Sequence, residues 1–375
     1  MVCHPMPRAH QPRLTEMLDR YIAQIVTRAF LLIIVGLTAL FSLLAFVEQL
    51  SLVGEGQYKL HDALIYTVLT APSRLLQIAP IAMLLGTLVG LGALAKNAEL
   101  TAFRSFGISQ ARIIGAALKL CIPIIIGLFF VAQFVVPPAQ QAAQREKAAA
   151  LGDALPGLSN GGFWTQKDGV FLNVQNYTGS RIIRGVSIFT FAPHGVLQTL
   201  IQADSATPEP NGVWQLQNVR RYTITDHQIT LDSTATLSWK PFLTTRQLTL
   251  LSLPPQTMPP LALYRYVRQL KAQHQEALVY EQTFWNMVAI PLSLIGMTLI
   301  AGPFVFGLQR SGGAGRQIVV GALIGMSFIL VQQIIGYLGL LLALSPAFSA
   351  LAPSLLLLAI GGWSMERGQL RARRS

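Results

Sequence analysis

The sequence predicts an α-helical membrane protein with six transmembrane helices, three on each side of an inserted all-β, jellyroll-like domain. Of its 375 residues, 52% are hydrophobic and only 12% are charged, about half the charged fraction of a soluble globular protein. The apolar segments form two clusters, the first ending near Val136 and the second beginning near Asn286. The polar stretch between them has the alternation of half-buried strands.

The first cluster contains three segments of membrane-spanning length, about 20 residues each. No charged residue lies between Arg28 and Glu48 or in 75–95, and 113–136 carries only Lys119, near one end. These segments predict the first three spans.

The second cluster predicts three more spans. Residues 286–309 form the fourth, and 317–365 are uncharged over a length sufficient for two helices, with a break at Ser345-Pro346. The predicted domains are therefore 1–136, with the first three spans; 137–258, the β-domain; and 259–375, with a linker helix and the last three spans.

The intervening region predicts strands and tight turns. Residues 161–253 are rich in β-branched and aromatic residues and contain about eight short strand patterns, among them 213–216, 221–225 and 247–253. Such a series predicts a sandwich, jellyroll or open barrel. It could serve as a passive extracellular module, or its apolar interior could be a conduit or lipid-binding groove.

The net charge of +12 is distributed as a topology signal. Arginine and lysine residues precede span 1, lie between spans 2 and 3 and between spans 4 and 5, and follow span 6, whereas the other side has only Lys59 between spans 1 and 2. The positive-inside rule places both termini in the cytoplasm and the β-domain outside. This distribution argues against a nucleic-acid partner.

The sequence contains no pattern for catalysis. It has no G-x-x-x-x-G-K-[ST], H-E-x-x-H or G-x-S-x-G motif, and its histidines lack metal-ligand spacing. We therefore expect no enzymatic activity, no metal and no cofactor.

The segment LAKNAELTAFRSFGIS, residues 94–109, predicts a short cytoplasmic helix between spans 2 and 3. Asn97 can cap it and Gly107 can end it. We expect exposed apolar side chains that dock into another protein, or an amphipathic turn that lies on the lipid surface. The candidate docking residues are Glu99, Leu100, Phe103 and Arg104.

Glycine pairs four residues apart predict close helix contacts in spans 2 and 5. Gly86 and Gly90 favour packing within the chain, whereas Gly321 and Gly325 also suit a movable seam against a partner helix. Gln332 places an amide in span 5, where it needs a polar partner or a wet cavity.

Three basic residues lie near the expected outer surface of the bilayer. Arg74 is about 33 Å along a helix from Lys96, and Lys59 and Arg265 flank spans 2 and 4. Each could bind an anionic lipid headgroup or anchor its helix.

Several segments resemble the LptF/LptG family of lipopolysaccharide-export permeases. They are LDRYI before span 1, FVEQL at its end, APIAMLLGTLVGLGALAKNAEL in span 2 and YRYVRQLK before span 4. The resemblance covers nearly the whole chain, and the Leu-Asp-Arg-Tyr opening favours the LptG branch.

The resemblance implies a permease subunit of the inner membrane that passes lipopolysaccharide from the outer leaflet through its periplasmic jellyroll. It implies a sister LptF-like subunit, two copies of an LptB-like ATPase and an LptC-like subunit. Spans 1 and 5 would form lateral gates, and Glu99 matches the carboxylate that contacts the ATPase. Lysines often found in the family are replaced here by Ala45, Ser51, Leu52 and Ser73. The alternatives are a permease for another lipid or lipoprotein, or a membrane scaffold for envelope assembly.

Overall fold

The computed structural model describes residues 11–151, 163–167, 169–176, 183–192, 196–209, 212–225, 228–241, 255–272, 277–307, 314–342 and 344–374. They form two compact units. The first comprises Met1–Glu48, Thr67–Gln140 and Pro259–Ser375, and the second comprises Gln49–Tyr66 and Gln141–Met258.

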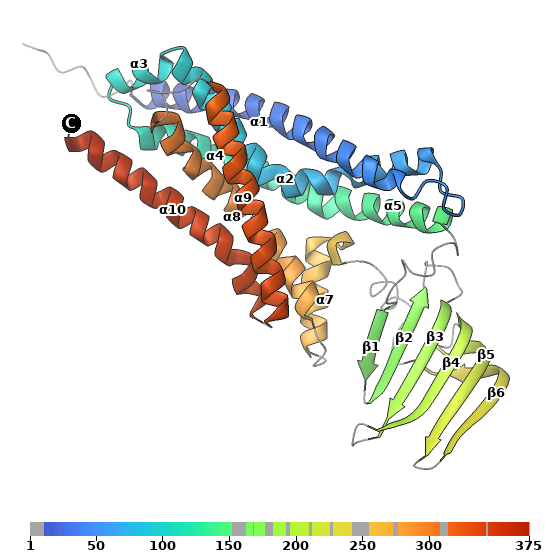
Figure 1. Ribbon diagram of the computed structural model, residues 1–375. Coiled ribbons are helices and arrows are strands. Elements are labelled where there is room, and N and C mark those ends of the chain that lie inside the picture. The colour runs from blue at the N-terminus through green and yellow to red at the C-terminus, as the bar shows by residue number, and fades with distance from the viewer. Residues whose placement is uncertain are drawn as a thin grey trace, which may run out of the picture. The chain divides into compact units, whose positions relative to one another are not determined.

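Long helices dominate the first unit (Figure 1). They are α1 (Gln11–Leu50), α2 (Leu60–Lys96), α3 (Glu99–Ser105), α4 (Gln110–Phe130), α7 (Pro260–Ala272), α8 (Leu278–Gly307), α9 (Ala314–Leu341) and α10 (Pro346–Arg374). Among the described residues, six helices are long and apolar enough to cross a membrane. The prediction of three spans on each side of a β-domain is confirmed.

α4 continues through a π-helical turn, η2 (Val131–Val135), into α5 (Val136–Leu151). The sequence of this continuation is polar, with Gln140, Arg145 and Lys147, so the helix extends beyond its apolar part. The sequence prediction assigned residues 137–151 to the β-domain, but the structure shows them as part of α5. Their alanines and charged residues favour a helix.

α2 lies at the centre of the helical unit. In its most apolar stretch 78% of residues are buried, compared with 11% in α1 and 17% in α9. Its buried side chains include Met83, Leu84, Leu88 and Leu91. α1 and α9 therefore direct most of their apolar side chains away from the interior.

α8 and α10 pack closely through small residues. Side-chain atoms of Leu357 and Leu299 lie where a Cβ would stand on Gly296 and Gly361. Buried hydroxyls also pair across this contact, with 2.8 Å between the Oγ atoms of Ser293 and Ser354. Small and hydroxyl residues allow helix backbones to approach closely in a membrane.

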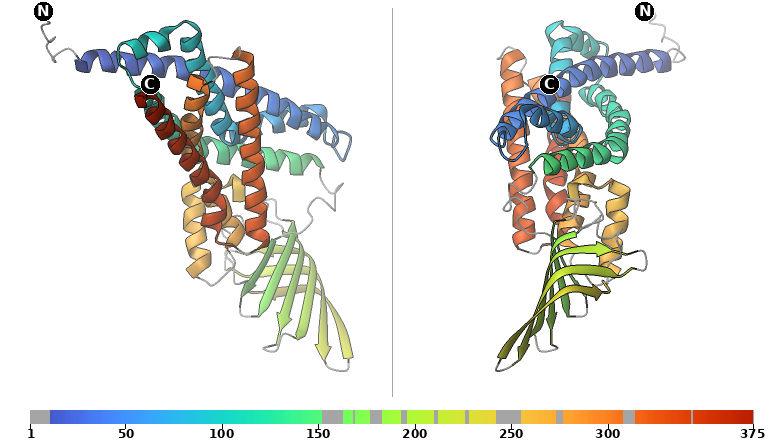
Figure 2. Two further views of the ribbon diagram at one scale, coloured as in Figure 1. Left: turned by 60° about the vertical axis from the view of Figure 1, so that its left-hand side comes forward. Right: turned by 90° about the vertical axis from the view of Figure 1, so that its right-hand side faces the viewer.

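One antiparallel sheet forms the β-domain, with its strands in chain order (Figures 1 and 2). The strands are β1 (Phe163–Lys167), β2 (Val170–Asn176), β3 (Ile183–Phe191), β4 (Leu197–Pro208), β5 (Trp214–Thr225) and β6 (Gln228–Trp239). Two strand patterns predicted separately, 213–216 and 221–225, belong to β5. The described residues thus form six strands, and the last predicted strand, 247–253, lies outside them.

The sheet has a crease that crosses five strands. The pairing of described residues skips the row that contains Gln175, Gly185, Asp204, Asn218 and Ala235, while the register on both sides stays the same. Gly185 and Asn218 have φ angles of 65° and 51°. A positive φ within a strand turns the following side chains to the other face.

The crease explains the burial pattern on the apolar face. Trp214 and Leu216 are buried before it on β5, and Val219 is buried after it, a shift of one residue in the alternation. On β3, Ile183 and Val186 show the same shift across Gly185. The apolar cluster therefore stays on one face although the strict period of two is broken.

Candidate functional site

α3 is a short helix whose end follows the sequence prediction. Gly107 has φ 80°, and the N–H groups of Gly107 and Ile108 donate to the carbonyls of Arg104 and Phe103 at 3.0 Å. This is the Schellman arrangement that favours glycine. The predicted cap by Asn97 is wrong. Ala98 precedes the helix with φ 61° and makes no side-chain capping bond.

The apolar side chains of α3 divide between interior and surface. Leu100 is only 1% exposed and belongs to the core of the helical unit, and Phe103 packs half-buried against that core. The expectation that this pair lies exposed is wrong, because both residues anchor α3 to its own chain. Phe106, just after the helix, is 83% exposed. Sequence reasoning missed it, although it stands three residues after Phe103 and so continues the helical spacing.

Glu99 is connected to the start of α1. The hydroxyl of Tyr21 donates to Glu99 Oε2 at 2.9 Å. Two residues earlier, Asp19 Oδ2 accepts from Lys119 Nζ of α4 at 2.6 Å. Two polar contacts therefore attach α1 to the elements on both sides of the short loop that follows α3. Arg104 is exposed on the same helix.

The glycines of spans 2 and 5 both mark contacts of α2. A Cβ on Gly86 would lie 2.8 Å from Phe30 Cα, and one on Gly90 would lie 3.0 Å from Val26 Cα, so α1 lies against these glycines. Gly321 and Gly325 of α9 face side chains of α2, namely Leu85, Leu88 and Ile81. The glycines of span 5, which is α9, thus pack against α2 of the same chain. Gln332 lies half-buried farther along α9.

The three predicted headgroup residues have different surroundings. Arg74 is half-buried, and its guanidinium donates to the carbonyl of Thr67 at 3.0 Å. Lys59 is exposed and belongs to the second compact unit, and Arg265 is exposed on α7 of the first. Their role in headgroup binding stays a prediction.

Sequence reasoning missed Lys147, the cation of a small polar cluster in the second unit. Its Nζ donates to Gln49 Oε1 at 2.9 Å and lies 4.8 Å from the centre of the Tyr66 ring. Burial raises the pKa of Tyr58, whose neutral hydroxyl donates to the same oxygen at 3.5 Å. The sequence shows a lysine four residues before Leu151, but its position on a helix follows only once residues 136–151 are known to form α5.

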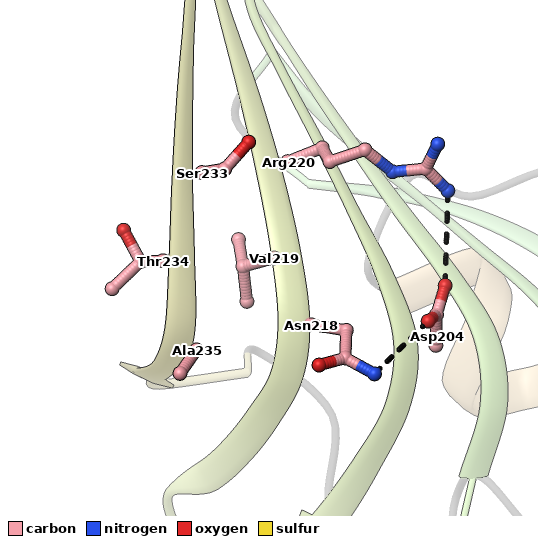
Figure 3. Close-up of a pocket in the computed structure, with 7 residues that line it drawn as sticks. All are labelled: Asp204, Asn218, Val219, Arg220, Ser233, Thr234 and Ala235. Atoms are coloured by element: carbon pink, nitrogen blue, oxygen red, sulfur yellow. Dashed lines mark hydrogen bonds and ion pairs between the residues drawn. The ribbon is translucent and has the colours of Figure 1, made fainter.

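The β-domain has a shallow pocket of about 350 Å³ at its crease (Figure 3). Two of its polar side chains, those of Asn218 and Arg220, are directed at the carboxylate of Asp204. Asn218 Nδ2 donates to Asp204 Oδ2 at 3.2 Å, and the Arg220 guanidinium lies 3.7 Å from Oδ1. Ser233, Thr234 and Ala235 of β6 complete the lining. Because these groups mainly satisfy one another, the pocket is best explained as a support for the crease.

Comparison with known proteins agrees with this architecture. The family model for the lipopolysaccharide export system permease LptF/LptG matches residues 20–367. The permease protein LptG of Haemophilus influenzae is 32% identical over 352 residues, covering 93% of this chain and 98% of that protein. LptG of Escherichia coli K12 is 31% identical over the same shares. The chain therefore belongs to the LptF/LptG family of lipopolysaccharide export system permeases.

Proposed function

We propose that this chain is an LptG-like permease subunit of the inner membrane, which extracts lipopolysaccharide and passes it to its β-domain. The main observation that supports this proposal is how α1 and α9 pack on α2. α1 and α9 both pack on it through glycines, yet each directs a long apolar surface outward. Two such helices on a fixed central helix can move apart and together without exposing backbone polar groups to lipid.

The charge distribution supports an orientation with both termini in the cytoplasm and the β-domain in the periplasm. In that orientation, Lys147 and Gln49 belong to the periplasmic side. Lipopolysaccharide carries phosphates in its headgroup, and a half-buried lysine held by an amide suits an anionic oxygen. We expect Lys147 to contribute to headgroup binding. Arg74, Lys59 and Arg265 stay predicted contributors, each judged within its own unit.

The energy source is expected on a partner chain, an LptB-like ATPase dimer, because the sequence has no P-loop. α3 provides an exposed guanidinium at Arg104, and Phe106, just after the helix, provides an exposed aromatic ring for such a partner. Movement of α3 would reach α1 through the hydrogen bond between Glu99 and Tyr21. An LptF-like sister permease and an LptC-like subunit complete the expected assembly.

The coupling proposal is tested by reconstituting the full complex in proteoliposomes. Glu99→Arg and Phe106→Ala should each reduce co-purification of the ATPase by about tenfold, the loss expected for a central interface residue. Thr101→Ala, also exposed on α3, is the control. Unchanged co-purification in both variants would remove α3 from the ATPase interface.

A second variant separates docking from transmission. Tyr21→Phe removes the hydroxyl that donates to Glu99 and leaves the ring in place. ATPase binding and ATP hydrolysis should remain, while lipopolysaccharide release per ATP falls. If the variant releases as much lipopolysaccharide per ATP as the wild type, the conformational change reaches α1 by another route.

A further inference from the structure

A basic surface lies on the first part of α1, beside the contacts that Asp19 and Tyr21 make with α4 and α3. Arg20, Ala23, Gln24, Thr27 and Arg28 line a shallow pocket of about 340 Å³. Arg20, Gln24 and Arg28 are exposed and recur every four residues. They therefore share one face of the helix, and the two arginine Cα atoms are about 12 Å apart along its axis.

The acidic residues near these arginines do not form ion pairs with them. Asp19 pairs with Lys119, and Glu99 accepts from Tyr21. No ion pair joins Arg20 or Arg28 to any residue in the part of the chain that the structure describes. Ile22 and Val26, on the opposite face, are fully buried. The arginine face is thus oriented outward, with two positive charges that form no ion pair among the described residues.

The same face becomes apolar one turn later. Leu31 is 53% exposed and Val35 is 65% exposed, and at 3.6 residues per turn both lie within about 80° of Arg20 around the helix. A surface with two guanidiniums at one end and branched aliphatic side chains at the other matches a phospholipid, with its anionic headgroup at the membrane surface and its acyl chain inside.

We propose that Arg20, Gln24 and Arg28 bind the phosphate of an anionic phospholipid in the leaflet where α1 begins, with an acyl chain along Leu31 and Val35. Guanidinium groups bind phosphate oxygens through paired N–H donors, and the Gln24 amide adds a further donor. The ligand is a resident membrane lipid rather than cargo, since the outward-leaflet headgroup residues belong to the other end of the spans. The site depends only on α1 crossing the membrane and not on the proposed transport.

The test uses the full chain in nanodiscs made mostly of phosphatidylcholine with a minority of photoactivatable phosphatidylglycerol. Crosslinks, mapped by mass spectrometry, should concentrate on α1 between Arg20 and Val35. Arg20→Gln with Arg28→Gln should lower this yield by roughly fivefold for each arginine removed. Arg112→Gln, which removes an exposed cation at the start of α4, should leave it unchanged.

Two further arms distinguish headgroup-specific binding from general contact with the bilayer. Photoactivatable phosphatidylcholine at the same concentration should crosslink weakly. The double variant Arg20→Lys with Arg28→Lys should retain part of the yield, because lysine keeps the positive charge but lacks the planar guanidinium that binds two phosphate oxygens. Equal yields from the two lipids would overturn the proposal, as would an unchanged yield in the glutamine variant. Displacement of the crosslinks by lipopolysaccharide, or by the sister subunit in the assembled complex, would also overturn it. Thermal unfolding of each variant checks that the fold is retained.

Discussion

The helical unit and the β-sheet treat apolar side chains in opposite ways. Large exposed apolar residues are numerous on α1 and α9, whereas on the sheet they include only Val196, Ile229 and Leu231 among the described residues. Lipid is as apolar as a protein interior, so a membrane helix gains little by burying such side chains. The sheet instead collects its apolar residues in one buried cluster, as expected of a domain that folds in water.

Glycine also has different roles in the two regions. Gly86 and Gly90 allow the backbone of α1 to approach α2, with no unusual dihedral angle. Gly185 instead provides a positive φ where the sheet changes its alternation. Close approach organises the helices, and backbone conformation organises the sheet. Substitutions can separate these two requirements.

The largest effect is expected for Gly86→Leu. A side chain here meets the backbone of Phe30, with 2.8 Å to its Cα, and backbone cannot move aside as a flexible side chain can. We expect a loss of about 3 kcal/mol in the free energy of unfolding, or more. Thermal unfolding in detergent measures it. Gly115→Leu, with open space at the Cβ, is the control, and equal behaviour of the two variants would contradict the tight contact.

Gly185→Val should have a smaller, local effect on the sheet. The variant combines a β-branched residue at positive φ with a contact to the flexible side chain of Gln175, at an expected cost of about 2 kcal/mol. Hydrogen exchange of β2, β3 and β4 should become faster while the helices remain protected. Gly212→Val, also at positive φ but in open space, isolates the dihedral contribution. Faster exchange throughout the chain would argue against a local crease.

Leu323→Asn tests the outward apolar surface of α9. Leu323 is 60% exposed, so the free energy of unfolding in detergent should change by no more than about 0.5 kcal/mol. Lipopolysaccharide release from proteoliposomes should fall, because an amide is introduced on the surface that meets lipid or substrate. Leu323→Met is the apolar control. A large loss of stability would mean that this face is packed in the folded chain.

The smallest effect concerns alkaline pH at the contact between α7 and α8. Burial raises the pKa of Tyr266 above its ordinary value of 10.0, with a further contribution from Tyr280. A raised pKa in the folded state contributes stability that is complete below pH 10 and is lost as the pH rises above it. Protection of α7 from hydrogen exchange should therefore decline above pH 10 in the wild type. It should decline less in Tyr266→Phe, and identical profiles would contradict the assignment.

The sequence predicted the elements better than their contacts. Charge-free lengths located the six spans, and glycine spacing located close approaches at Gly86 and Gly321. Hydropathy could not assign Leu100 to the core, because an amphipathic helix shows which face is apolar and not what covers it. Lys147 was missed for a related reason, since its partner Gln49 is 98 residues away in the chain.

The sequence by itself determined the membrane class, the inserted β-domain and the family. These follow from the length of apolar segments, the alternation of strands and motifs contiguous in the chain. Only the tertiary structure decided that α2 is the buried helix, that Glu99 is linked to Tyr21, and that five strands share a crease. The physical reason is that hydrophobicity reports the preference of a residue for any apolar surroundings. It does not distinguish a lipid tail from a neighbouring helix, and long-range packing makes that choice.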